Sequence, residues 1–237
     1  MKKHISEVIE VIRRTPASKS IRFRKPDGFG YEPGQYNIFT PLPDESDLSK
    51  PLSFSSSPSE PFLEVTKRIS SSDYSAVMDR VVKGSGVAFA GPAGQLTYRG
   101  GNGPVVFIAG GIGITPVRSI LRYLEDTEVP EERVLFYANQ CLEEIAFREE
   151  LERMREENPL FELVHILQDP PKGWKGPTGF ITPELIEGLV TDDEAARTIF
   201  LCGPPPMVSA LESFLVELRV PREKIRKEQL LGYETLV

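Results

Sequence analysis

The feature that most constrains the fold is a change of hydrophobic pattern at the glycine-rich stretch 100–104. Before it, short runs of alternating apolar and polar residues are separated by Gly, Pro and Asp, which is typical of strands joined by tight turns. After it, short apolar runs alternate with longer segments of helical spacing, which is typical of a parallel sheet with helices. The sequence therefore predicts two domains, an antiparallel β-barrel over residues 1–99 and an α/β domain over residues 104–237.

The same patterns give the expected elements of each domain. In the first, six strands are expected at 4–13, 20–24, 35–40, 51–57, 62–67 and 87–90, with one helix near 73–82. In the second, strands are expected at 105–109, 133–138, 161–167 and 198–202, with a short fifth near 224–227. Helices are expected at 116–125, 144–157, 183–189 and 205–218. Strands that alternate with helices predict helices on both faces of the sheet.

Charge limits the classes of function. The chain has a net charge of −7 and lacks the basic character that nucleic-acid binding requires. Residues 1–99 carry +3 and residues 100–237 carry −10, so the first domain could steer an acidic protein partner, although scattered surface charge explains the same numbers. No apolar run of about 18 residues predicts a membrane span, and the N-terminus lacks the apolar region of a signal peptide.

Cysteine content points to a reducing environment. Cys141 and Cys202 are the two cysteines of the sequence, and they lie far apart along the chain. Two thiols alone are too few for a metal or iron–sulfur cage, and they do not suggest a disulfide framework. We therefore predict no metal site and a cytoplasmic location.

A glycine-rich turn, Gly110–Pro116, follows the apolar run 105–109 and precedes a helical pattern. Thr115 suits an N-cap and Pro116 suits a first helical residue. Backbone N–H groups and the helix dipole at such a turn favour an anion, so the turn could hold a pyrophosphate. The third glycine of the usual dinucleotide fingerprint is missing, so this motif is weak by itself.

A second turn of this kind, Leu201–Met207, follows the apolar strand expected at 198–202. Gly203 permits close approach of the backbone, and the prolines from Pro204 onward suit the start of a helix. If the two strands are parallel neighbours, both turns lie at the carboxyl edge of the sheet, where ligands bind in open α/β folds.

Two segments of the first domain combine hydroxyls with cations. Lys50–Pro58 is rich in serine and begins with a lysine, so it could bind a polar ring edge and a phosphate, although a polar edge strand is the simpler reading. In Thr66–Ser75, Lys67 and Arg68 precede a serine-rich helix start. That start suits a phosphate, and it also suits a helix capped by Ser72 or Asp73.

The order of these segments resembles the ferredoxin–NADP⁺ reductase superfamily, over nearly the whole chain. The motifs that carry the resemblance are Lys50-Pro51-Leu52-Ser53 for R-x-Y-S, Gly91–Gly94 for G-P-x-G, Gly110–Pro116 for G-G-x-G-x-T-P, Trp174–Gly179 for W-x-G-x-x-G, Cys202–Met207 for C-G-P-x-x-M, and Glu228-Gln229-Leu230 for the E-x-F tail. Each motif alone is weak to moderate, and their common order makes chance an unlikely account. The resemblance implies a flavin-binding barrel followed by a nicotinamide-dinucleotide domain.

The resemblance also implies roles for single residues. Ser53 would bind the flavin near N5 and O4, and Leu52 would cover the ring. Flavin phosphate would meet Lys50, Lys67 and Ser75 or the helix start before it. The dinucleotide would bind at Gly111, Gly113, Thr115, Pro116, Gly203 and Pro204. Cys202 would lie near the nicotinamide and Glu228 near the reactive edge of the flavin, although Cys202 could equally be a small buried apolar residue.

Two departures from the family's pattern concern the flavin motif. Lys50 replaces an arginine, so a bidentate phosphate contact becomes a point charge, and Leu52 replaces a tyrosine that would stack on the ring. They leave the choice between FAD and FMN open. We favour FAD because Lys67 and Arg68 offer a second phosphate site.

The segment after the second strand of the nucleotide domain is where this superfamily distinguishes NADH from NADPH. A 2′-phosphate requires arginine, and residues 137–147 contain none. Glu143 and Glu144 would repel a phosphate, and Arg148 is expected at least one turn inside the helix. We therefore expect NADH to be preferred over NADPH.

The resulting expectation is a flavin-dependent NAD(P)H oxidoreductase. It would pass hydride from the nicotinamide to flavin N5 and electrons to a separate acceptor, such as a ferredoxin, a flavodoxin or an oxygenase component, with an acidic protein favoured. The alternative is a catalytically degenerate flavin- or nucleotide-binding module that serves regulation or sensing.

Overall fold

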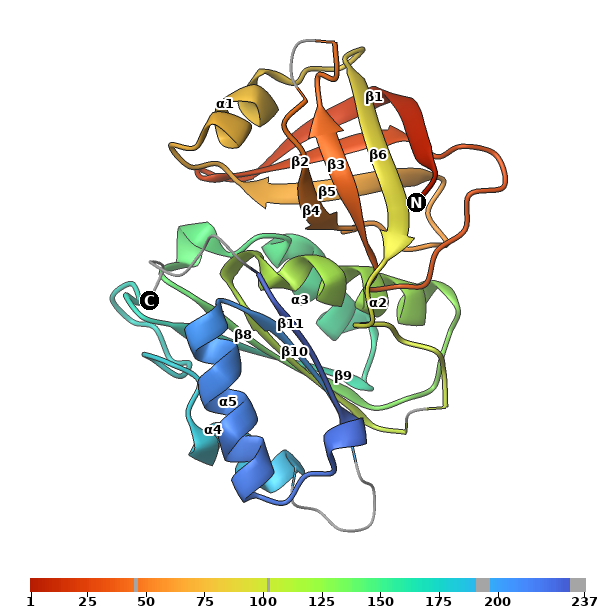
Figure 1. The fold of residues 1–237 in the computed structure, drawn as a ribbon. Coiled ribbons are helices and arrows are strands. Elements are labelled where there is room, and N and C mark those ends of the chain that lie inside the picture. Colours follow the sequence, from red (N-terminus) through yellow and green to blue (C-terminus); the bar gives the residue numbers. More distant parts are fainter. Residues whose placement is uncertain (45–46, 102, 191–196, 231–237) are drawn as a thin grey trace. The chain divides into compact units, whose positions relative to one another are not determined.

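The computed structural model describes residues 1–44, 47–101, 103–190 and 197–230 (Figure 1). Asn102, within the expected linker, lies outside these residues. The chain divides into two compact units, Met1–Tyr98 with Arg118–Thr127, and Arg99–Val117 with Glu128–Val237. We call them the barrel unit and the nucleotide unit, and we describe each by itself.

The barrel unit contains six antiparallel strands and one helix. The strands are β1 (Lys3–Thr15), β2 (Ser18–Arg24), β3 (Tyr36–Pro41), β4 (Lys50–Ser53), β5 (Phe62–Arg68) and β6 (Gly86–Ala93), and α1 spans Asp73–Arg80. Their order in the sheet is β4-β3-β6-β1-β2-β5. After β4, Phe54 pairs with Val65 of β5, and the Ser55 amide donates to the Glu64 carbonyl at 2.8 Å. These bonds join the two outer strands, so the sheet closes on itself and the predicted barrel is confirmed.

Alternating apolar side chains fill the interior of this barrel. The core includes fully buried residues from five of the six strands and the segment after β4, among them Ile21, Phe23, Phe39, Phe54 and Leu63. Alternation along a strand places every second side chain inside, which is why the period of two in this part of the sequence predicts the barrel. The hydroxyl-rich stretch after β4 departs from this pattern, because Ser55, Ser56 and Ser57 are all fully buried.

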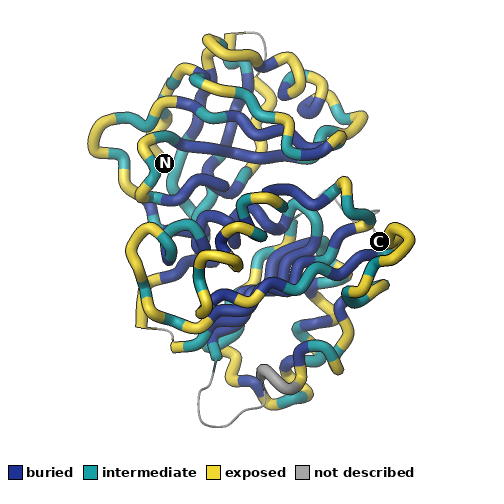
Figure 2. The backbone as a smooth tube through the Cα atoms, turned by 180° about the vertical axis from the view of Figure 1, so that it is seen from behind, coloured by how far each residue is buried: buried dark blue, intermediate teal, exposed yellow. Residues whose placement is uncertain are grey.

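The nucleotide unit contains a parallel five-stranded sheet, as predicted. Its strands, in the order β11-β10-β7-β8-β9, are β7 (Val105–Gly110), β8 (Arg133–Asn139), β9 (Phe161–Leu167), β10 (Thr198–Gly203) and β11 (Ile225–Gln229). Every residue of β7 and β10 is buried, and Figure 2 shows the sheet as a dark block of buried backbone. Continuous apolar runs such as these are typical of strands buried on both faces.

Helices connect the strands of this sheet. They are α2 (Ile114–Asp126), α3 (Arg148–Glu157), α4 (Pro183–Val190) and α5 (Pro205–Glu217), with short 3₁₀ turns at Gly111–Gly113, Leu142–Glu144 and Arg222–Lys224. Apolar residues of α4 and α5 pack on the face that carries Val106 and Ile108. His165 of β9 lies on the opposite face, 4.0 Å from Glu152 of α3.

Three expected boundaries differ from the structure. The strand expected at 51–57 ends at Ser53 apart from the single bridge at Phe54. The helix expected from residue 116 begins earlier, with a 3₁₀ turn at Gly111–Gly113 that runs into α2. Thr115 is therefore not an N-cap; it lies inside the helix, where its hydroxyl donates to the Ile112 carbonyl at 3.1 Å, and Pro116 is the third residue of α2.

The third difference is the start of α3. It begins at Arg148 and not at Glu144, because Phe147 adopts a left-handed conformation with φ 60° that interrupts the helix. Burial explains this backbone conformation, since Ile145, Ala146 and Phe147 are all at least nine-tenths buried.

Among the described residues, no helix combines the length and the apolar character needed to cross a membrane.

Candidate functional site

The two glycine turns of the nucleotide unit lie side by side. Strands β7 and β10 are parallel neighbours, with Ala109 opposite Cys202, so the turns that follow them share one edge of the sheet. A Cβ on Gly113 would lie 2.4 Å from the carbonyl oxygen of Cys202. Only glycine fits at such a distance from a neighbouring backbone. The structure thus brings together Gly111, Gly113 and Gly203 as the sequence predicted.

Met207 covers the other glycines at this edge. A Cβ on Gly110 would lie 2.6 Å from its sulfur, and a Cβ on Gly203 would lie 2.4 Å from its methyl group. Gly110 supplies no side chain to cap the turn that follows. Pro204, at the N-cap of α5, makes no side-chain capping hydrogen bond either. The turn at Gly111–Gly113 therefore leaves backbone amides at this edge that suit an anionic ligand, whereas prolines 204–206 carry no amide hydrogen and leave α5 little to offer an anion.

Thr115 and Pro116 have structural roles in this arrangement. The Thr115 side chain is buried, and its hydroxyl is directed to the Ile112 carbonyl. Pro116 lies within the first turn of α2, where the missing amide hydrogen costs little. Of the residues predicted at this turn, the glycines therefore offer backbone groups, whereas Thr115 shapes the turn.

Cys202 and Glu228 are cross-strand partners. They occupy matching positions in the β10–β11 pair, and the Leu230 amide extends this pairing by donating to the Gly203 carbonyl at 3.0 Å. Cys202 is fully buried. Its pKa is raised well above the ordinary value, first by burial and then by the carboxylate of Glu228. The thiol is thus neutral and packs as a small apolar group, so the structure favours this simpler reading.

The end of β8 is the segment expected to distinguish the two dinucleotides. Gln140 donates to the Asp169 carboxylate at 2.5 Å, and Glu143 and Glu144 lie in the following 3₁₀ turn. The expectation for Arg148 was wrong in position, because it is the first residue of α3. Its guanidinium Nε donates to the Glu152 carboxylate at 2.8 Å, so its charge is paired within the helix.

In the barrel unit, the cations predicted to meet a phosphate gather at the first turn of α1. The ammonium groups of Lys50 and Lys67 lie 5.6 and 5.9 Å from the centre of the Tyr74 ring. Lys67 is buried, and its pKa is lowered to about 8, first by burial and then by the charge of Lys50. Two cations held this close favour an anion between or beside them.

Serine hydroxyls surround the same helix start. Ser72 is the N-cap and accepts from the Ser75 amide at 3.3 Å, which confirms one of the two caps expected. The Ser70 hydroxyl lies 3.0 Å from that of Ser75. We call Lys50, Lys67, Ser70, Ser72 and Ser75 the cation–serine cluster. Its charge and hydroxyls suit a phosphate group.

The flavin motif itself lies on β4 beside this cluster. Ser53 is buried and opposite Tyr36 of β3, and Leu52 packs against the barrel core. The structure places Lys50, Leu52 and Ser53 on one four-residue strand at the joined edge of the sheet.

Two features escaped the sequence analysis. Arg118 and Glu60 form an ion pair with the guanidinium and carboxylate 2.5 Å apart, although Arg118 falls inside a helical pattern that reads as apolar. Phe180 is 57% exposed and follows the bridge between Leu167 and Thr178 at the end of β9. An exposed ring near a glycine loop was the available signal for Phe180, and none marked Arg118.

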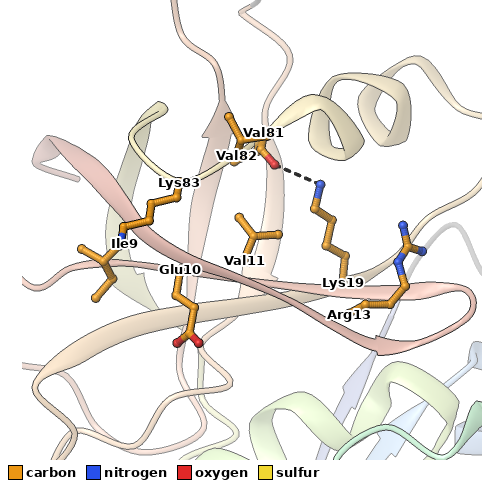
Figure 3. Close-up of a pocket in the computed structure, with 8 residues that line it drawn as sticks. All are labelled: Ile9, Glu10, Val11, Arg13, Lys19, Val81, Val82 and Lys83. Carbon is orange, nitrogen blue, oxygen red and sulfur yellow. Dashed lines mark hydrogen bonds between the residues drawn. The ribbon is translucent and has the colours of Figure 1, made fainter.

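A concavity of about 680 Å³ lies elsewhere on the barrel unit (Figure 3). It is lined by residues of β1, by Lys19 and by residues 81–83 directly after α1, and it contains no predicted site residue. The Lys19 ammonium donates to the carbonyls of Asp79 at 2.6 Å and Val81 at 3.0 Å. Lys19 therefore caps the C-terminus of α1.

Known proteins resemble the chain in sequence and in fold. Residues 107–213 match the oxidoreductase NAD-binding domain family. NADH-cytochrome b5 reductase 1 of Debaryomyces hansenii is 38% identical over 144 residues, which are 60% of this chain and 51% of that protein. The chain spans about half the length of the curated relatives that it matches first.

Two solved structures share the fold over nearly the whole chain. The cytochrome b5 reductase domain of Ulva prolifera nitrate reductase is 21% identical, with a TM-score of 0.82 over 96% of this chain and 97% of that one. A ferredoxin NADP⁺ reductase from Neisseria gonorrhoeae, solved with FAD and NADP bound, is 20% identical, with a TM-score of 0.81 over 97% and 99%.

Proposed function

We propose that the chain is a flavin-dependent NAD(P)H oxidoreductase of the ferredoxin–NADP⁺ reductase superfamily, which the match of residues 107–213 to the oxidoreductase NAD-binding domain family and the shared fold support. The observation that carries the proposal is the cation–serine cluster at the start of α1. Its two ammonium groups, from β4 and β5, and its capped helix start would form an anion site close to Ser53 of β4. Binding of a flavin phosphate at this site would hold the flavin ring beside β4.

The fit of the chain to a dinucleotide supports the second half of the proposal. Gly111 has a φ of +52°, and a Cβ there would meet nothing within 4 Å, so its backbone borders open space that suits a pyrophosphate. Gly113 and Gly203 instead allow the two turns to pack closely, because a Cβ at either would lie 2.4 Å from a neighbouring protein atom. We propose that Gly111, Gly113, Gly203 and Pro204 bind the pyrophosphate and nicotinamide part. Phe180, with its exposed ring, is the surface on which we propose the adenine to stack.

A bound flavin would supply the acceptance of hydride at N5 and the release of single electrons. The work of this chain is then to bind and orient the two cofactors and to exclude water from between them. We propose that the Ser53 hydroxyl binds the N5–O4 edge and Leu52 covers the ring. Glu228 would lie near the reactive edge, and the neutral thiol of Cys202 would shape the floor of the nicotinamide site without titrating.

FAD and NADH are the cofactors that we propose. Two phosphates would match the two cations, Lys50 and Lys67, better than the one phosphate of FMN. NADH is favoured because the arginine nearest to the end of β8, Arg148, is paired with Glu152, and because Glu143 and Glu144 precede it. NADH also appears in the names of the curated relatives.

We propose a separate redox protein with an acidic face as the electron acceptor, in a cytoplasmic setting. The net positive charge of residues 1–99 supports an acidic partner. The low cysteine content, two in the whole sequence, supports a setting where disulfides are kept reduced.

The alternative is a flavin- or nucleotide-binding module without turnover. Lysine at position 50 and leucine at position 52 favour it, because each weakens a contact that the family's pattern makes with the flavin. The glycine turns favour the enzyme, since they follow neighbouring parallel strands and Gly111 between them borders open space.

An anaerobic titration tests the proposal. Purified protein is loaded with FAD, freed of excess, and titrated with NADH and then NADPH while flavin absorbance is followed. We expect bleaching by one equivalent of NADH and slower bleaching by NADPH. Protein that stays colourless after incubation with FAD or FMN contradicts the proposal, and a bound flavin that neither dinucleotide bleaches favours the alternative.

A further inference from the structure

Helix α2 carries two adjacent buried polar side chains, besides Thr115, where a helical pattern predicts a core. Arg118 is 2% exposed and Ser119 is fully buried. By its contacts the helix is divided, since residues up to Val117 belong to the nucleotide unit and residues from Arg118 belong to the barrel unit. Buried polar groups need specific partners. The Ser119 hydroxyl accepts from the Gly34 amide at 3.4 Å, and the carbonyls to which Arg118 and Ser119 donate lie in one short segment of the barrel.

That segment is residues 55–57, directly after the proposed flavin strand. The Arg118 guanidinium donates to the Ser55 carbonyl at 2.9 Å. The Ser119 hydroxyl donates to the Ser56 carbonyl at 2.5 Å. The Ser57 amide donates to the Glu60 carboxylate at 2.7 Å. Backbone groups of three consecutive residues, which belong to two consecutive peptide groups, are thus held by side chains, beginning two residues beyond Ser53.

Arg118 and Glu60 also hold each other. The two nitrogens of the guanidinium reach the two carboxylate oxygens at 2.5 and 3.0 Å, and the side chains are 3% and 13% exposed. A planar guanidinium can pair with a carboxylate in two places and still donate to the Ser55 carbonyl, which an ammonium group cannot do in the same geometry. The arrangement is therefore specific for arginine.

We propose that Arg118, Ser119 and Glu60 are positioning residues for the flavin-binding segment. They fix the backbone that follows Ser53 and so fix where its hydroxyl meets the flavin edge. This inference rests on the proposed function and adds residues that do not touch a cofactor. Because small displacements of reacting groups slow a reaction strongly, loosening this support slows flavin reduction more than it weakens the binding of either cofactor.

The test compares Arg118→Gln with Arg122→Gln as the matched control. Arg122 lies on the same helix and pairs with Asp126 one turn later, with a side chain 37% exposed. In FAD-loaded protein under anaerobic conditions, we expect Arg118→Gln to lower the limiting rate constant of reduction by NADH roughly tenfold to hundredfold. KM for NADH and the Kd for FAD should stay within about threefold, and Arg118→Lys should restore part of the rate. Arg122→Gln should match the wild type.

Two further measurements keep the proposal open to refutation. Ser119→Ala removes one hydroxyl and leaves the ion pair, so it serves if Arg118→Gln fails to fold, and we expect it to slow reduction as well. The absorption spectrum and midpoint potential of bound FAD should shift in Arg118→Lys and Ser119→Ala but not in Arg122→Gln, whether or not NADH reduces the wild type. Unchanged rates, spectra and potentials in both variants overturn the positioning role. A wild type that binds FAD without being reduced overturns the proposed function instead.

Discussion

The pKa of Lys67 should depend on whether an anion is bound at the cation–serine cluster. Its ammonium is buried, and the charge that most perturbs it is the like charge of Lys50. Both burial and this charge lower its pKa, to about 8. An anion at the cation–serine cluster would favour the protonated form and raise the pKa again.

Flavin affinity should therefore depend on pH in a predictable direction. Below pH 8, Lys67 is already protonated and binding needs no proton; above it, binding must take one up. The Kd for FAD should rise as the pH passes 8, by up to about tenfold per unit. Fluorescence titrations between pH 6.5 and 9.5 measure this, and Lys67→Arg should give a flatter profile because arginine stays charged. A pH-independent wild type would show that Lys67 does not meet the phosphate.

His165 is a second residue whose titration has a measurable consequence, this time for stability. It faces α3 from β9, and its pKa is lowered to about 4, chiefly by burial; the carboxylate of Glu152 opposes the shift, while Arg148 and Arg155 add to it. The unfolded chain binds a proton near pH 6.5 that the folded chain refuses until about pH 4. Stability is therefore full above pH 6.5 and falls as the pH drops toward 4.

The expected loss from this residue is about 3 kcal/mol across that window. Urea unfolding at pH 7.0, 5.5 and 4.0 measures it, with His165→Gln as the comparison. The variant should lose less stability on acidification than the wild type does. If both lose the same amount, other groups account for the acid sensitivity.

At the scale of elements, the turns after β7 and β10 lie in contact with each other. This contact explains why both turns are short and contain glycine. Gly113 leaves no room for a side chain, because the obstructing atoms are the carbonyl group and backbone of Cys202 and Gly203. Backbone of two buried strands cannot shift as a flexible side chain can.

Gly113→Ala should therefore destabilise the protein by about 1–3 kcal/mol and raise the KM for NADH. Gly30→Ala is the matched control, because a Cβ at Gly30 meets nothing within 4 Å and should change neither quantity. Chemical denaturation and steady-state kinetics on both variants give the comparison. An alanine at 113 that leaves stability and KM unchanged would mean that the turns separate easily.

Most elements could be predicted from local pattern, whereas contacts between distant segments could not. The period of two over Ser20–Arg24 and the buried runs at 105–109 and 198–202 predicted strands, because burial alone decides such patterns. The start of α3 was missed because a left-handed Phe147 is stabilised by burial that the sequence does not reveal. Arg118 was missed for a related reason: its partners lie about sixty residues away, and spacing within a helix says nothing about them.

At the scale of the whole molecule, the barrel unit is not continuous in sequence. It needs Arg118–Thr127 in addition to Met1–Tyr98, so the expected domain 1–99 lacks one of its parts. Without that part, Glu60 and the carbonyls of Ser55 and Ser56 lose the partners described above.

A fragment of residues 1–99 should accordingly fold less stably than the barrel does in the full chain. We expect a broadened thermal transition by circular dichroism and weaker FAD binding. Adding a peptide of residues 114–127 should restore part of both, and the same peptide with Arg118→Gln should restore less. A fragment that melts sharply and binds FAD as the full chain does would show that the helix is dispensable.

The division of α2 also bears on how such proteins can be recombined. A chimaera joined at the glycine-rich stretch 100–104 would take Ser55, Ser56 and Glu60 from one parent and Arg118 and Ser119 from the other. Parents that pair these positions differently would yield hybrids with mismatched buried charges, even where each half is sound. A chimaera that exchanges the nucleotide unit should therefore take residues 118–127 from the same parent as the barrel. Such a chimaera needs one junction on each side of this segment in addition to the junction at 100–104.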